Sequence, residues 1–201
     1  MWSGRCALSD PALALLEFDS ISAGIVAGDA MVKTAPIAAI YVGTVHPGRY
    51  LVMVSGDTAS VEIARDTGVG VGSLTDSVFL PDIHPDVTAA IVAGTAGADL
   101  RAEALGIVET ATVSAVIDAA DAGVKAAEVT VSAVRLADGL GGKGYVLFSG
   151  VVAEVEAAVD AAVSRCGLHG TLIRSDVIPR LHAEMAENLS SEPRFMRRVG
   201  S

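Results

Sequence analysis

Apolar residues along the chain follow two different periods in turn. A short continuous apolar run ends in a glutamate at Leu13–Glu17, and in the segment after it apolar positions recur at spacings of four and three residues. The first pattern is typical of a buried strand and the second of an amphipathic helix. We expect the helix to bury one stripe of small and apolar residues, which comprises Ile21, Ile25, Gly28, Val32 and Ala35.

The pattern continues with two more strands and another helix. Strands are predicted over Ile37–Val42 and Tyr50–Ser55, separated by TVHPGR, in which proline and glycine favour a tight turn. A second helix is expected to begin after Gly56 and to end at Gly68, where glycine suits the C-cap. A last short strand precedes Pro81. The first half of the chain therefore predicts the order β-α-β-β-α-β.

The second half of the chain repeats the first. Residues Leu13–Ala35 align with Leu105–Ala127 without a gap, and eleven of the 23 positions are identical. Further along, PGRYLVMVSGD corresponds to GGKGYVLFSGV, and FLPDIH corresponds to VIPRLH. The second copy is expected to have matching elements, namely strands at Leu105–Glu109, Val129–Leu136 and Tyr145–Ser149, a buried stripe of Val113, Ile117, Ala120, Val124 and Ala127, and a second helix that ends at Gly167.

Two copies of this order predict an α+β protein with two ferredoxin-like domains, each an antiparallel sheet with helices on one face. We expect a first domain over residues 11–98, a second over residues 101–190, and a flexible basic tail over residues 191–201. Alanine and glycine recur on both first helices, which indicates close packing of these helices on their sheets.

The composition argues against several other classes of protein. The net charge is −10, whereas proteins that bind nucleic acid need clustered basic residues, so we expect no nucleic-acid partner. Cys6 and Cys166 lie far apart with no CxxC spacing, which favours a reducing compartment such as the cytoplasm. No apolar run approaches the roughly 20 residues of a membrane span. P-loop, GxSxG and HExxH motifs are absent, so we expect no enzyme.

Several linked motifs resemble one known family. GIVETATVSAVIDAADAGVKAA, the strand–loop–strand that ends in SG, and VIPRLH are similar to the bacterial microcompartment shell domain. Two copies in one chain resemble its tandem class, and KTAPIAAIYVGTVHPGRYLVMVSGD is most similar to the tandem shell protein of propanediol-utilisation compartments. The resemblance implies a homotrimer that forms a pseudohexameric disc. Such discs tile with other shell proteins around encapsulated enzymes, and a small polar metabolite crosses a central pore.

The resemblance places two non-equivalent loops around that pore. Their glycine-rich backbone offers N–H donors to polar or anionic solutes, and two basic side chains add positive potential that one aspartate offsets. The expected pore-lining residues are Thr44, Val45, His46, Pro47, Gly48 and Arg49 from the first copy and Asp138, Gly139, Leu140, Gly141, Gly142 and Lys143 from the second.

His46 is the residue in the pore that changes the expected chemistry. In the propanediol relative, a cysteine at this position binds an iron–sulfur cluster, whereas thiolates are absent from this loop, so a conventional cluster is not expected. Three His46 side chains could hold zinc only if their nitrogens converge within about 2.1 Å of one point, and we expect no cofactor. Histidines titrate near a reference pKa of about 6.5, so pore charge is expected to respond to pH.

Lys33 and Lys125 occupy matching positions near the ends of the first helices. A surface lysine is also favoured there by the helix dipole alone. The resemblance implies that both lie at the tile edge, where a long apolar stem can follow a flat contact. It also implies that Arg180 reaches the neighbouring tile, whereas Asp82 replaces the arginine in the first copy.

Two other functions stay open from the sequence. One is a redox conduit that holds a metal or an iron–sulfur centre in the pore. The other is a ferredoxin-like regulator that binds a small ligand and remains a discrete oligomer.

Overall fold

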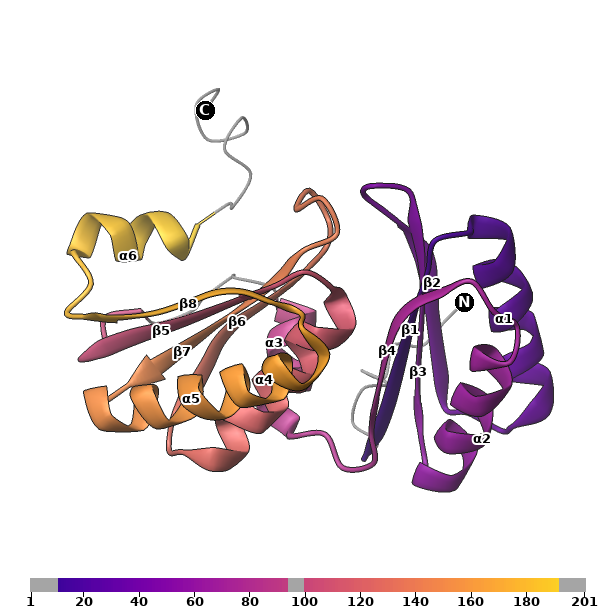
Figure 1. Ribbon diagram of the computed structural model, residues 1–201. Coiled ribbons are helices and arrows are strands. Elements are labelled where there is room, and N and C mark those ends of the chain that lie inside the picture. The colour runs from indigo at the N-terminus through magenta and orange to yellow at the C-terminus, as the bar shows by residue number, and fades with distance from the viewer. Residues whose placement is uncertain (1–10, 94–99, 192–201) are drawn as a thin grey trace.

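The computed structural model describes residues 11–93 and 100–191, which form two four-stranded sheets with helices (Figure 1). The elements of the first copy are β1 (Ala12–Phe18), α1 (Ile21–Thr34), β2 (Ala39–Val45), β3 (Arg49–Gly56), α2 (Thr58–Val69), β4 (Leu74–Leu80) and α3 (Pro85–Ala93). Those of the second copy are β5 (Ala104–Thr110), α4 (Val113–Ala126), β6 (Thr130–Leu136), β7 (Gly144–Gly150), α5 (Val152–His169), β8 (Leu172–Pro179) and α6 (Ala183–Leu189).

Both sheets have the same strand order and equivalent registers. The orders are β2-β3-β1-β4 and β6-β7-β5-β8, and every pairing is antiparallel. Leu13 pairs with Leu80 in the first sheet, and Leu105 pairs with Ile178 at the equivalent place in the second. This is the ferredoxin-like arrangement, so the predicted α+β class with two such units is confirmed.

The ends of the helices follow local capping chemistry. Ser20 and Thr112 cap α1 and α4, because each side-chain oxygen accepts the backbone N–H three residues later. The predicted helix ends at Gly68 and Gly167 are wrong. Gly68 lies inside α2, where an added Cβ would sit 2.7 Å from the Leu16 side chain, so glycine serves close packing there. Helix α5 continues to His169.

The stripe predicted for the buried face of α1 is also largely wrong. The residues that face the sheet of the first copy are Gly24, Ala27, Gly28 and Met31, whereas Ile21, Ile25 and Val32 are exposed. Gly24 lies directly under the Tyr50 ring, and an added Cβ would come within 2.4 Å of that ring. The small residues thus allow the helix to approach its sheet, and the larger residues point away from it.

The last strand of each copy is followed by one helix that the sequence pattern does not predict. Helix α3 lies between the two sheets, and its Val87 and Ala90 share a buried cluster with Val134 of β6 (Figure 1). Helix α6 contributes Ala186 to a cluster on the sheet of the second copy, with Leu147. None of the helices in the described ranges is long and apolar enough to cross a membrane. Cys6, residues 94–98 of the predicted first domain, and all of the predicted tail beyond residue 191 lie outside the described residues.

Candidate pore and assembly surfaces

The second copy packs its first helix against the outer face of the first sheet. Val113 and Ile117 of α4 are fully buried in one cluster with Leu13 of β1 and with Val78 and Leu80 of β4. We call this contact the internal junction. It buries apolar side chains on both sides, and this burial is the main source of its stability.

A buried carboxylate lies at the end of the internal junction that is nearest the pore loops. The Glu17 side chain is fully buried at the end of β1, and its Oε1 accepts the Ser114 backbone N–H at 2.6 Å. Its Oε2 lies 3.5 Å from Arg49 Nη1, at the base of the first pore loop. Burial raises the pKa of Glu17, and the hydrogen bond from Ser114 opposes this effect. The adjacent Thr112 hydroxyl donates to Asp76 of β4.

The opposite end of the internal junction is polar as well. The His84 backbone N–H donates to Asp121 Oδ1 at 2.8 Å, and Lys125 Nζ lies 2.7 Å from Asp121 Oδ2. Lys125 also donates to the Asp82 carbonyl oxygen. Lys125 therefore ties α4 to the loop after β4, at the end of the junction away from the pore loops.

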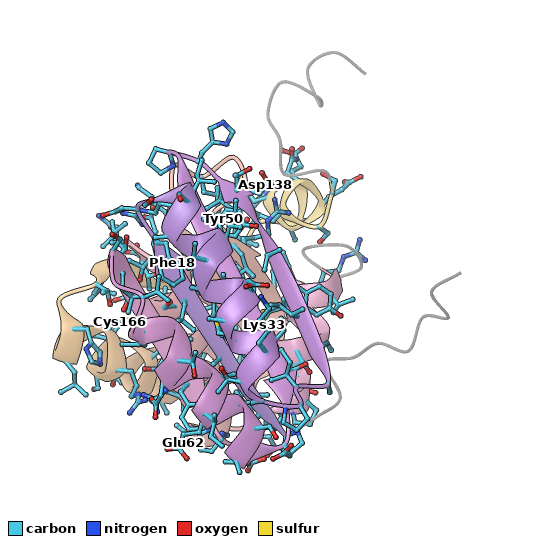
Figure 2. All side chains as sticks on the ribbon, turned by 90° about the vertical axis from the view of Figure 1, so that its right-hand side faces the viewer. Phe18, Lys33, Tyr50, Glu62, Asp138 and Cys166 are labelled. Carbon is cyan, nitrogen blue, oxygen red and sulfur yellow. The ribbon has the colours of Figure 1, made fainter. Side chains whose placement is uncertain are left out.

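The residues on α1 that correspond to the buried face of α4 are open to solvent. Ile21, Ile25 and Val32 are 43%, 54% and 42% exposed, whereas their counterparts Val113, Ile117 and Val124 are buried. Figure 2 shows α1 on the side of the molecule facing the viewer, with no further layer in front of it. We call this surface the helix face.

The second copy leaves the complementary surface open. Ile178 and Met185 are 36% and 50% exposed, whereas the equivalent Leu80 and Val87 of the first copy are buried at the internal junction. These residues come from β8 and α6, and we call their surface the strand face. The chain therefore exposes both halves of the contact that it makes internally.

The two predicted pore loops lie at the same end of the molecule (Figure 1). The first is the turn between β2 and β3, in which the Gly48 N–H donates to the Val45 carbonyl oxygen. The second joins β6 to β7. Gly142 of the second loop approaches the first: an added Cβ would sit 3.1 Å from Pro47 Cδ and 3.3 Å from Arg49 Nη1. Its positive φ of 90° also favours glycine there. The internal junction thus places one loop of each kind side by side.

Both basic residues of the pore loops have acidic partners within the chain. Arg49 lies near Glu17 and 3.7 Å from Asp19, and Lys143 Nζ lies 2.9 Å from Glu109 Oε1. Their positive potential is therefore largely offset at the base of each loop, an effect that sequence spacing does not reveal. His46 is exposed at the tip of the first loop.

The remaining predicted edge residues are exposed. Lys33 is paired with Asp29 one turn earlier, as Lys125 is with Asp121. Arg180 has a positive φ of 54°, and its backbone N–H donates to the Glu103 carbonyl oxygen. Within residues 11–93 and 100–191, no three His, Cys, Asp or Glu side chains gather as metal ligands do. Burial raises the pKa of the Cys166 thiol, and Figure 2 shows this residue apart from Asp138 of the second loop.

Comparisons with known proteins agree with this geometry. The BMC domain family matches residues 12–83 and 104–181. The bacterial microcompartment shell protein PduT of Citrobacter freundii is 43% identical over 176 residues, which cover 87% of this chain and 95% of PduT. The shell protein EutM of Salmonella typhimurium is 40% identical over 85 residues, which cover 42% of this chain and 86% of EutM.

A solved structure extends the similarity to the whole fold. The crystal structure of a microcompartment protein from Desulfitobacterium hafniense superposes with a TM-score of 0.77 and 36% identity. The match covers 89% of this chain and 99% of the other. The chain belongs to the BMC domain family of bacterial microcompartment shell proteins, and it contains two copies of the domain in tandem.

Proposed function

We propose that three copies of this chain close into a ring of six domains that serves as a tile of a microcompartment shell in the cytoplasm. The observation that supports this ring is the pair of exposed surfaces, the helix face and the strand face, which reproduce the two sides of the internal junction. A contact between these two faces is head-to-tail, and repeated head-to-tail contacts form a closed ring when the rotation closes. If all the junctions are alike, six domains alternate between first and second copies.

The residues at the tile edge can be assigned from the same equivalence between the internal junction and the junction between chains. Lys125 ends the internal junction on the side away from the pore loops, so it would lie at the perimeter of the ring. At the junction between chains, Lys33 would take the corresponding place and donate to the Arg180 carbonyl of the next chain. The exposed stems of both lysines and the Arg180 side chain are then available for contacts with neighbouring shell proteins.

The pore would be lined by three loops of each kind. Because the basic residues are paired with Glu17, Asp19 and Glu109, the lining would consist mainly of backbone groups and the exposed His46 side chain. Such a lining suits a small polar metabolite better than a strongly charged one. We propose no catalytic activity for this chain, which belongs to a family of structural shell proteins.

The ring is tested on the unmodified protein. Sedimentation equilibrium is expected to give the mass of three chains, and electron microscopy of the concentrated protein is expected to show tiled layers. Isolated monomers or dimers at every concentration would contradict the proposal and favour the regulator. About one metal per three chains, or a visible absorption band, would favour the redox conduit.

The role of the pore is tested at His46, whose side chain is exposed at the tip of the first loop. His46→Ala is expected to raise the permeation of a small polar solute through assembled shells, because it removes the exposed imidazole ring from the proposed lining. Glu156→Ala, an exposed position on α5 outside both loops, provides the control. Equal permeation by the His46 variant and the unmodified shell would refute a role of His46 in the pore.

A further inference from the structure

Glu17 and Glu109 occupy the same place in the two copies. Glu17 lies opposite Leu51 in the β1–β3 pair, and Glu109 lies opposite Tyr145 in the β5–β7 pair. Each carboxylate is also paired with the basic residue that follows the pore loop of its own copy, at 3.5 Å for Arg49 and 2.9 Å for Lys143. On the side that faces the pore loop, the two carboxylates therefore have equivalent basic partners.

The two sites differ on the side of the next domain. Glu17 is fully buried because α4 covers it and donates the Ser114 N–H to it. The side chain of Glu109 is 34% exposed, and within the described residues no helix amide donates to it. Glu109 thus has only half of the partners that its counterpart has.

The missing donor is present on the helix face. Ser22 is the counterpart of Ser114, and Ser20 caps α1 through Ala23 as Thr112 caps α4 through Ala115. Ser22 is exposed, and within residues 11–93 and 100–191 its backbone N–H has no hydrogen-bond partner. A carboxylate near this first turn is also favoured by the positive end of the helix dipole.

We propose that Glu109 accepts the Ser22 backbone N–H of the next chain, and that this bond closes each junction between chains close to the pore. The proposal rests on the ring described above. The bond buries Glu109, and removal from water strengthens its pairing with Lys143. Glu109 would then join the first turn of the neighbouring α1 to the base of the second pore loop, as Glu17 joins α4 to the first loop.

The first test follows the Ser22 amide of the full chain by hydrogen exchange. Its exchange is expected to slow at least tenfold when chains associate, because the N–H gains an acceptor that is buried. If the unmodified chain does not associate into trimers, the proposed ring itself fails. If trimers form and the Ser22 amide exchanges as fast as in the dissociated chain, the ring stands and the role of Glu109 is refuted.

The second test compares variants by their trimer dissociation. Glu109→Ala is expected to weaken each junction by about ten- to a hundredfold, the range for a hydrogen bond to a charged group. Glu109→Gln keeps an acceptor oxygen, so its loss is expected to be smaller and its Ser22 amide to stay protected. Glu156→Ala removes an exposed carboxylate from α5 and provides the control. Trimers of both Glu109 variants that dissociate no more readily than this control would refute the proposal.

Discussion

The internal junction and the two open faces use nearly the same residues, yet one is buried and the others are exposed. Ile117 is fully buried against the first sheet, whereas Ile25, its counterpart on α1, is 54% exposed. A soluble domain that worked alone would have no reason to keep a row of branched apolar residues on an outward helix face. In the ring proposed above, duplication has fused one junction into the chain and left the equivalent junction to form between chains.

The largest effect is expected when a charge is placed at equivalent positions in the two regions. Ile117→Asp puts an unpaired carboxylate into the internal junction, which is expected to cost at least about 4 kcal/mol and to abolish stable folding. Ile25→Asp is expected to change the free energy of unfolding of a single chain by less than about 1 kcal/mol, because the side chain is exposed there. It should nevertheless abolish the trimer. Urea denaturation and sedimentation measure the two effects.

Ile63 provides a matched control for this pair of variants. It is 50% exposed on α2 and belongs to neither face, so Ile63→Asp is expected to leave both folding and the trimer intact. Equal destabilisation of single chains by the changes at Ile25 and Ile117 would show that α1 has no distinct outward face. If the Ile25→Asp variant still formed a normal trimer, the helix face would take no part in assembly.

The sequence predicted the repeat, the β-α-β-β-α-β order and the turn between the second and third strands, but it misassigned the face of α1 that contacts its own sheet. Periodicity identifies the larger apolar residues, and on this helix Ile21 and Ile25 point outward. The inward side consists of Gly24, Ala27 and Gly28, which contribute little hydrophobicity and matter because they allow close approach. Two apolar sides of unequal residue size on one helix are the signal that would have identified both contacts.

The chemistry of the site was less accessible from the sequence than the fold. The family resemblance predicted the pore loops. The pairing of Arg49 with Glu17, 32 residues away, forms only because β1 and β3 lie side by side. The hydrogen bond from Ser114 to Glu17 spans 97 residues and requires both copies. Local patterns contain no information on such contacts, so the basic residues seemed free to charge the pore.

A smaller effect is expected at the outer ends of the junctions. Lys125→Met removes two hydrogen bonds within the chain and leaves the nearly buried Asp121 with fewer donors, which is expected to cost about 1–2 kcal/mol of unfolding free energy. Lys33→Met breaks only an exposed pair one helical turn apart, worth about 0.3–0.5 kcal/mol. Urea denaturation of dissociated chains measures both values. Equal losses of unfolding free energy in the two variants would contradict the conclusion that a dissociated chain contains one formed junction, at Lys125, and an open one at Lys33.

The smallest effect is a dependence of stability on pH at Glu17. Burial raises its pKa in the folded chain, so the charged form is favoured more in the unfolded chain. The contribution of Glu17 to stability is then complete below the unfolded pKa, near 4.3, and is lost as pH rises through the raised folded value. The slope cannot exceed about 1.4 kcal/mol per pH unit for one proton.

Glu17→Gln is expected to remove this decline while keeping an oxygen for the Ser114 N–H. The variant should therefore gain stability relative to the unmodified chain as pH rises from about 4 upward. Both are unfolded by urea in the Ile25→Asp background, which is expected to keep the chains apart. The same change at Glu109, which occupies the equivalent strand position but is partly exposed, separates the effect of burial from that of losing a charge. A difference that shrinks with rising pH would mean that Arg49 and Ser114 outweigh desolvation at the internal junction.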